Sequence, residues 1–473
     1  MKITLIQLPH FYEEGASRSP TIYPLGLGYI ASALKANGIE YEALDFWVGQ
    51  TNVDDAIKIA GKSNCDVFGV SVYSTQYPYL KELTLGLKEK LPNIPIICGG
   101  VGATYSANII LKHTGADICV IGEGDETIVD LLRNMNNLGS VKGIVFKDKK
   151  GEIRQTEERP QIRDLGSISL PDRDIFDQER YTENHKKFGG FRSIDILSGR
   201  GCPYKCNFCS LTFRGCRLRP IDDIVSEIGY VKDKYRVKHF SFDDELLVVS
   251  KKRMLELCEK IKPFHMKWRC QGRINLVDEE ILIAMKEAGC ERIGYGVESF
   301  SQSILDNMNK EIKTDIIIPV IDMTRRIGLD PIVQYMYGYP GENDETINAT
   351  EKFFRKIDHT YVGFSTTPLP GSPLYKECLN KGIIKDEDGY LMNLTSGYNV
   401  LKPQVNLTEF SDQEFVEKRI MLARRVNAAY YEGHPLRKIK FGFNRAKHIC
   451  TLAITTPSYF VKRVKERLKL SSA

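Results

Sequence analysis

Three closely spaced cysteines are the residues of this chain that most directly indicate chemistry. Cys202, Cys206 and Cys209 lie in a loop that follows a predicted strand. Thiolates at such spacing can surround one metal centre, and they select zinc or iron–sulfur. A structural zinc ion needs a fourth ligand, for which Cys216 is the nearest candidate, although the loop lacks the paired knuckles typical of structural zinc sites. A cubane held by three cysteines would keep one iron open for chemistry.

The remaining cysteines do not form such a group. Disulfide frameworks suit short secreted chains, whereas this chain has 473 residues, twelve cysteines and no signal-peptide cleavage site after its first segment. We therefore expect a cytoplasmic protein, without a segment apolar enough to span a bilayer, in which isolated cysteines are small buried hydrophobes. These isolated cysteines are Cys65, Cys98, Cys119, Cys258, Cys290, Cys378 and Cys450.

The formal charge of +5 is concentrated near the C-terminal end of the sequence. Residues 437–469 hold ten Lys or Arg and one acid, Glu466, so the rest of the chain is net acidic. The overall balance gives no sign of nucleic acid, and we expect no such partner. From residue 457 the tail has the pattern of a short amphipathic basic helix, which suggests peripheral membrane contact as an alternative to a solvated end.

The elements that must position a site fall into two α/β regions. Residues 1–140 alternate β-branched runs with helical stretches, the pattern of a doubly wound parallel sheet. Glycine, serine and threonine gather where several of these strands end, which is the edge where ligands bind in such sheets. The predicted strands are 2–7, 41–46, 66–72, 95–99 and 118–122.

After a connector with a small hairpin at 141–190, residues 191–375 predict a partial (β/α)6 barrel of the TIM type. The expected strands are 193–198, 239–243, 267–271, 292–297, 331–338 and 360–366. The expected helices are 221–235, 251–261, 278–288, 301–308, 314–327 and 344–355. Beyond them, residues 376–473 predict a mainly helical region, with a long helix at 408–433 whose capping box is Ser411 and Glu414.

The cysteine loop resembles the signature of the radical S-adenosylmethionine (SAM) superfamily, and further motifs follow in order, one for each βα unit. They include FSFDDE at 240–245, Arg273 after the third predicted strand, and GYGVES at 294–299. The resemblance implies a 4Fe–4S cluster on the three cysteines and SAM on the open iron. It implies cosubstrate contacts from six residues: Phe208, Asp243, Asp244, Arg273, Glu298 and Ser299.

The N-terminal region resembles the cobalamin-binding domain that precedes the radical domain in cobalamin-dependent radical SAM enzymes. The motifs are PLGLGY at 24–29, GG with Ala103 and Thr104, and GEGDET at 122–127. A cobalt-ligating Asp-x-His-x-x-Gly motif is absent, and His10 is predicted to be a loop residue rather than a ligand. The corrinoid contacts implied are Ser71, Tyr73, Gly99, Gly100, Thr104, Gly122, Glu123 and Gly124.

Together the resemblances imply an enzyme that cleaves SAM to a 5′-deoxyadenosyl radical, in first place a cobalamin-dependent C-methyltransferase. Radical cyclisation, dehydration, rearrangement or C–C coupling is the alternative, and a zinc-stabilised binding protein is the remaining hypothesis from another class. An electron donor of flavodoxin or ferredoxin type and a small-molecule, lipid or peptide substrate are the expected partners. The substrate pocket is expected between the two loop edges, with six candidate lining residues: Tyr73, Tyr77, Cys216, Tyr295, Tyr335 and Tyr337.

Overall fold

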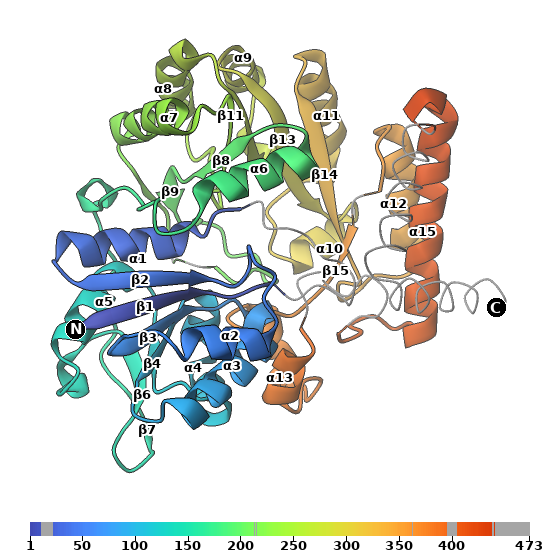
Figure 1. Ribbon diagram of the computed structural model, residues 1–473. Coiled ribbons are helices and arrows are strands. Elements are labelled where there is room, and N and C mark those ends of the chain that lie inside the picture. Colours follow the sequence, from blue (N-terminus) through green and yellow to red (C-terminus); the bar gives the residue numbers. More distant parts are fainter. Residues whose placement is uncertain are drawn as a thin grey trace.

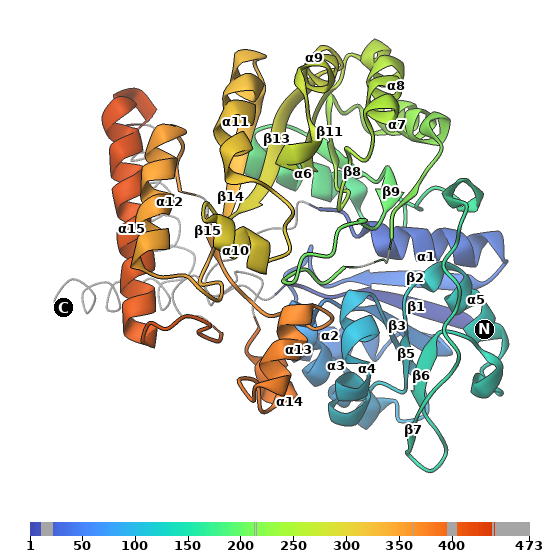
Figure 2. The same ribbon diagram turned by 180° about the vertical axis from the view of Figure 1, so that it is seen from behind.

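The computed structural model describes residues 1–10, 22–211, 213, 215–361, 363–394, 404–437 and 439. Two sheets, the first mainly parallel and the second wholly parallel, lie one beyond the other with helices packed on them, and a long C-terminal helix lies beside the second (Figure 1). The view from behind, in Figure 2, shows the segment after β9 (Gly199–Arg200), which carries the cysteines, running between the two sheets. Among the residues described, no helix has the length and apolar character that a membrane crossing requires.

The first sheet has seven strands in the order β2-β1-β3-β4-β5-β6-β7. The chain winds outward from β1, which pairs in parallel with β2 on one side and β3 on the other. This confirms the doubly wound sheet, and the observed strands differ from the predicted ones only at their ends. The hairpin expected in the connector extends this sheet, because β6 pairs antiparallel with β5. The strands are β1 (Lys2–Gln7), β2 (Glu40–Asp45), β3 (Val67–Ser71), β4 (Ile96–Gly99), β5 (Ile118–Val120), β6 (Ile144–Lys147) and β7 (Ile153–Gln155).

Helices cover both faces of this sheet, so its central strands are apolar on both sides. On one face, α1 (Leu25–Ala36) packs with α5 (Gly124–Arg133). On the other, α2 (Val53–Ala60), α3 (Tyr77–Lys90) and α4 (Val101–His113) form a second apolar core.

The second sheet has six parallel strands in chain order, β8-β11-β12-β13-β14-β15, which confirms the partial barrel. Alternate side chains of the first five of these strands, β8 to β14, enter a large apolar core beneath the outer helices. The strands are β8 (Ser193–Ile196), β11 (His239–Phe242), β12 (Lys267–Gly272), β13 (Cys290–Glu298), β14 (Asp330–Tyr337) and β15 (Gly363–Ser365). The helices are α6 (Gln178–Gly189) before β8, then α7 (Ile221–Tyr235), α8 (Lys251–Ile261), α9 (Glu279–Glu287), α10 (Gln302–Asn307), α11 (Ile317–Arg326) and α12 (Asp344–Lys356).

After the barrel the chain returns to the first sheet and then leaves it again. Helices α13 (Pro373–Asn380) and α14 (Glu387–Met392) add their apolar side chains to the core on the α3 and α4 face. Helix α15 (Asp412–Gly433) then packs along α12 (Figure 1).

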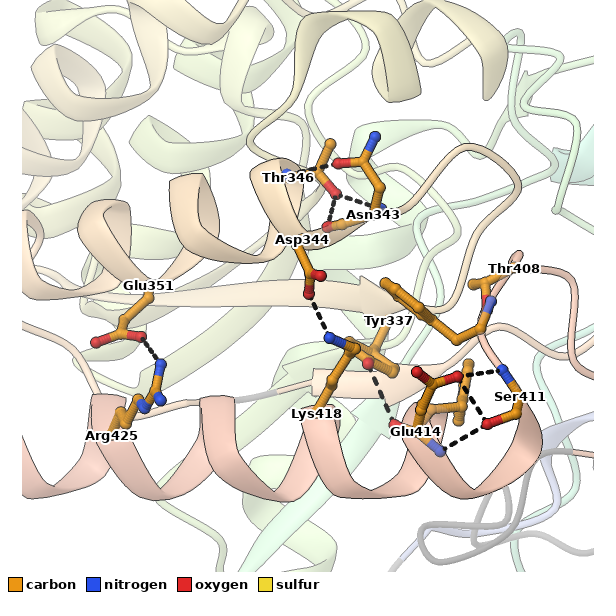
Figure 3. A network of polar contacts seen from close by, with 12 residues as sticks. Tyr337, Asn343, Asp344, Thr346, Glu351, Thr408, Ser411, Glu414, Lys418 and Arg425 are labelled. Atoms are coloured by element: carbon orange, nitrogen blue, oxygen red, sulfur yellow. Dashed lines mark hydrogen bonds and ion pairs between the residues drawn. The ribbon is translucent and has the colours of Figure 1, made fainter.

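The predicted capping box begins α15, because Ser411 and Glu414 satisfy each other's backbone N–H groups (Figure 3). Phe415 enters the barrel core, and its carbonyl accepts a hydrogen bond from the Tyr337 hydroxyl at 3.2 Å. Ion pairs Asp344–Lys418 and Glu351–Arg425 flank this contact on the surface. The helix predicted from residue 457 lies outside the described residues.

Candidate functional site

The cysteine loop is closed at its base by a short antiparallel ribbon. Strand β9 (Gly199–Arg200) pairs with β10 (Arg217–Leu218), so the segment between them projects as one loop after β8. Gly201, at φ +85°, begins the loop, and a Cβ there would collide with the Gly215 carbonyl oxygen. Only glycine fits this close approach without strain.

The loop is tied to both halves of the molecule by hydrogen bonds, so its path does not depend on its own residues alone. Toward the barrel, the Asn309 side chain donates to the Lys205 carbonyl at 2.8 Å. Toward the first sheet, Tyr105 of α4 donates to the Leu211 carbonyl at 2.7 Å. Three further bonds reach the barrel and the start of α13: Asn207 to Asn307 O, Ser210 to Pro370 O, and Leu374 N to Asn207 O.

The three thiols lie within electrostatic reach of one another. Burial, with the smaller effects of Cys206, Glu245 and Cys202, raises the pKa of Cys209 to about 12. Burial also raises the pKa of Cys202, against a lowering effect of the Arg273 charge. Thiols in such surroundings become thiolates only when a metal replaces their protons, so metal binding here would release protons.

Among the residues that the structure describes, the three cysteines are not gathered at one point. Within the described part of the chain, no three His, Cys, Asp or Glu side chains converge on a point as one ion would require. In a cubane, each cysteine binds a different iron, so the sulfurs need only surround a larger group. Cys216, the proposed fourth zinc ligand, is partly exposed, with its pKa raised by burial and by the nearby Cys202.

Glu298 and Lys310 form an almost buried ion pair beside the cysteine loop. Lys310 Nζ lies 3.2 Å from Glu298 Oε1 and 5.4 Å from the centre of the Phe208 ring. Glu298 adopts φ +70° at an irregularity of β13, and a side chain at Gly296 would meet its carboxylate. Ser299, next to it, is buried, and its hydroxyl accepts a hydrogen bond from the Ser301 N–H. The sequence analysis did not single out Lys310, because nothing in its local pattern distinguishes a buried lysine from an exposed one.

The two aspartates after β11 lie in different surroundings. Asp244 accepts hydrogen bonds from the backbone N–H and the hydroxyl of Ser198, each at 2.8 Å, so it fixes the end of β8. Burial raises its pKa to about 7. Asp243 faces the barrel interior, accepts from Ser241 at 2.9 Å, and has a pKa raised by burial.

Asp243 belongs to a buried polar network that the sequence did not indicate. Its carboxyl shares a hydrogen bond with the carboxyl of Asp195 in β8. The Asp195 carboxyl also accepts a hydrogen bond from the Tyr23 N–H at 3.0 Å. Arg269 of β12 donates to Ser241 and approaches His185 of α6 at 3.1 Å. Polar groups thus line the inner face of β8, β11 and β12, whereas the outer face is apolar.

At the carboxyl edge of the first sheet, the loops after β3, β4 and β5 lie near one another, and glycines leave part of their backbone uncovered by side chains. The Thr104 hydroxyl accepts from the Gly122 N–H at 3.1 Å and donates to the Gly100 carbonyl at 3.0 Å. A Cβ at Gly99 or Gly122 would meet no atom, so these glycines face open space. The Ser71 hydroxyl lies next to Gly100, within van der Waals reach of a Cβ there. This edge fits a large ligand that approaches the backbone closely.

His10, Trp47 and Tyr73 meet at the same edge. The His10 ring packs 4.4 Å from Trp47 and 5.5 Å from Tyr73, and burial lowers its pKa to about 4. Tyr73 is 50% exposed, yet desolvation, with the charges of Asp243 and Glu245 from the barrel, raises its pKa. Tyr73 of the first sheet therefore feels the negative charges of the barrel residues Asp243 and Glu245.

Glu123 does not share this edge with the glycines. Its side chain, 4% exposed, accepts hydrogen bonds at 2.7 Å from Arg200 and Arg217 of the ribbon. Arg200 also pairs with Asp125 at 2.9 Å. Glu123 and Asp125, around Gly124 at the start of α5, therefore clamp the base of the cysteine loop to the first sheet. The signal for this role lies 77 residues away in Arg200, so the local glycine-rich pattern did not reveal it.

Four of the tyrosines expected to line a substrate pocket are core residues, and that expectation is wrong. Their side chains point into the helical layers, where each hydroxyl has a partner. The pairs are Tyr77–Asp388, Tyr295–Thr324, Tyr335–Glu342 and Tyr337–Phe415 O. Tyr73 and Cys216 remain partly exposed.

Fold and site together define a class of enzyme: a half-barrel with a three-cysteine loop set against a doubly wound domain whose ligand edge faces the same space. Residues 196–354 match the radical SAM superfamily, and residues 15–132 match the B12 binding domain. This protein belongs to the cobalamin-dependent radical SAM enzymes.

Three relatives illustrate the match. An anaerobic magnesium-protoporphyrin IX monomethyl ester cyclase of Synechocystis is 30% identical, over 81% of this chain and 79% of that protein. An uncharacterized methyltransferase of Pyrococcus horikoshii is 26% identical, over 86% and 87%. The solved structure of the radical SAM methyltransferase TsrM from Kitasatospora setae, with cobalamin and a [4Fe-4S] cluster bound, has the same fold. It superposes with a TM-score of 0.66 at 16% sequence identity, over 80% of this chain and 75% of that chain.

Proposed function

We propose that this enzyme is a C-methyltransferase that uses a 4Fe–4S cluster, SAM and cobalamin. The observation that carries the proposal is the 2.7 Å hydrogen bond from Tyr105, in α4 beside the glycine edge of the first sheet, to the Leu211 carbonyl of the cysteine loop. The two ligand edges therefore face one space, as a transfer between two cofactors and a substrate requires. The similarity to a methyltransferase over most of both chains supports methyl transfer as the outcome.

The residues present fit these groups. Cys202, Cys206 and Cys209 would hold three irons of the cluster, and the ion pair Glu298–Lys310, with Phe208, would contact SAM at the open iron. The loops of Ser71, Gly99, Gly100 and Gly122 would receive the corrinoid. When bound, the cluster supplies the electron that cleaves SAM, and the corrinoid supplies the methyl group. The protein then orients the reactants and keeps water away from them.

The partners are part of the same proposal. The substrate is a small molecule, a lipid or a peptide, and electrons come from a flavodoxin- or ferredoxin-type donor. The protein acts in the cytoplasm, and its basic C-terminal tail brings it to anionic membranes. Flotation with anionic liposomes, with and without residues beyond 438, tests the last point, because equal flotation removes it.

Anaerobic reconstitution with iron, sulfide and hydroxocobalamin tests the cofactors. We expect corrin absorption bands to persist after desalting, and reduction in the presence of SAM to release 5′-deoxyadenosine. Because one SAM is cleaved to the radical and a second remethylates the cobalt, each methylated product should accompany one 5′-deoxyadenosine and one S-adenosylhomocysteine. A protein without a cubane, or one that releases no 5′-deoxyadenosine, would refute the proposal.

Cysteine variants provide a matched control for the cluster assignment. Replacement of Cys202, Cys206 or Cys209 by alanine should abolish the cluster, whereas C216A should keep full iron and SAM cleavage. Iron loss in C216A, together with bound zinc in the wild-type protein, would support the zinc-stabilised alternative.

Cyclisation is the second candidate, because the Synechocystis relative at 30% identity is a cyclase. It predicts 5′-deoxyadenosine without S-adenosylhomocysteine, since no second SAM is consumed in remethylation. The ratio of the two nucleosides, measured with native cell extract as the source of substrate, separates the candidates.

A further inference from the structure

Arg273 lies against the cysteine loop with all parts of its guanidinium in contact. It follows β12 directly and is 6% exposed. Nη1 donates to Cys206 Sγ at 3.6 Å, and Nη2 donates to the Lys310 carbonyl. The group lies over the Tyr204 ring, with Cζ 3.5 Å from the ring centre. This cation–π contact and the two hydrogen bonds fix both the direction of the cation and the position of the loop.

The acceptors around Arg273 are neutral. Its contacts are a thiol sulfur, a backbone carbonyl, an aromatic ring and the Asn275 side-chain oxygen at 3.4 Å from Nε. No carboxylate of the described chain forms an ion pair with it, whereas the similarly buried Arg173 pairs with Glu227, and Arg200 pairs with both Glu123 and Asp125. A buried cation without an anion is costly unless the site itself provides the negative charge.

The cysteine loop would provide that charge when it holds metal. With irons bound, the three sulfurs are thiolates, and the nearest of them to Arg273 is Cys206. The cation is then opposite an anionic cluster whose negative charge grows by one on reduction.

We propose that Arg273 is a positioning residue for the cluster, which holds the Cys206 sulfur by a charge-assisted hydrogen bond and raises the reduction potential of the cluster. A fixed positive charge and a hydrogen bond to sulfur stabilise the reduced state more than the oxidised state. Arg273 thereby eases electron entry from the external donor. The proposal rests on the cluster assignment and is independent of whether the product is methylated.

The test compares R273Q and R273K with the wild-type protein, each reconstituted anaerobically. The readouts are iron content and a redox titration followed by EPR, without SAM. We expect R273Q to have a more negative midpoint potential than the wild-type protein. R273K, which keeps the charge but cannot bond the sulfur and the Lys310 carbonyl together, should lie between them.

Arg292, on the exposed part of β13 and paired with Asp330 at 2.8 Å, provides the matched control. R292Q removes one arginine charge from the barrel away from the loop, so its potential should equal that of the wild-type protein. If R273Q keeps full iron and an unchanged potential, the proposal is overturned, while the cubane spectrum leaves the proposed function standing. If R273Q loses iron, the test depends on R273K, and a midpoint potential of R273K equal to that of the wild-type protein overturns the proposed effect of Arg273 on the potential. Iron loss in both variants would reduce Arg273 to an assembly residue and also overturn it.

Discussion

Replacement of Glu123 by glutamine separates two roles for a residue that the sequence places among the corrinoid contacts. In the structure, its carboxylate accepts from Arg200, Arg217 and the Ile162 N–H, at 2.7, 2.7 and 2.8 Å. E123Q keeps the shape and removes the charge, so Arg217 loses its anion and Arg200 retains only Asp125.

Breaking a buried pair by removing one partner costs about 3–5 kcal/mol. At the lower end, with about 2–4 °C per kcal/mol for regions of this size, we expect the Tm of the cofactor-free protein to fall by about 6–12 °C. Differential scanning fluorimetry under anaerobic conditions measures this shift. E126Q, on the same helix with an exposed side chain 4.0 Å from Arg159, is the control and should stay within 1–2 °C of wild type, about the effect of a surface pair.

A corrinoid contact would behave differently. If Glu123 served the cofactor alone, the variant would keep its Tm without cobalamin and lose only cobalamin retention. An unchanged Tm of cofactor-free E123Q would therefore refute the clamp.

Three further predictions concern the cysteine loop, the barrel and α15. G201A should fold but retain little iron after desalting, because a Cβ at Gly201 collides with the Gly215 carbonyl; full iron content would contradict this. The pKa of Asp244 is raised to about 7, so this carboxyl contributes stability that is complete below pH 4 and is lost as pH rises through 7. D244N should therefore raise the Tm at pH 8 and flatten the decline of Tm from pH 5 to 8. Parallel curves of Tm against pH for D244N and the wild-type protein would exclude this origin. F415A should destabilise the docking of α15 by about 3–5 kcal/mol, because Phe415 lies in the apolar core. K418A should cost at most about 1 kcal/mol, because Lys418 forms only a surface ion pair with Asp344 (Figure 3). The rates of limited proteolysis of the helix in the two variants measure this difference. Equal proteolysis of the two variants would show that the apolar contact does not dominate.

The fold could be predicted well because its signals are local. Strands such as β1 and helices such as α7 and α8 lie where β-branched runs and amphipathic periods indicate them. The cysteine loop was also evident because its residues are close in sequence, and each part of the glycine edge was evident because Gly, Ser or Thr directly follows a predicted strand.

The orientation of side chains was harder to predict, because it depends on distant partners. Tyr295 and Tyr337 lie in strands whose side chains alternate between the barrel interior and the helices, and an aromatic residue can take either side. Lys310 gains its role from Glu298, twelve residues earlier, and from the positive φ of its neighbours Asn309 and Glu311. No pattern in a single sequence encodes such contacts.

The return of the chain to the first sheet links the two halves in a way that matters for dissection. Segment 373–394 buries Tyr375, Tyr390 and Leu391 against the α3 and α4 face, and Asp388 pairs there with Lys81 at 2.8 Å. An N-terminal fragment ending before the barrel would leave that apolar face bare and would tend to aggregate. The corrinoid half is therefore not a detachable module, and its isolation would require the 373–394 peptide supplied in trans.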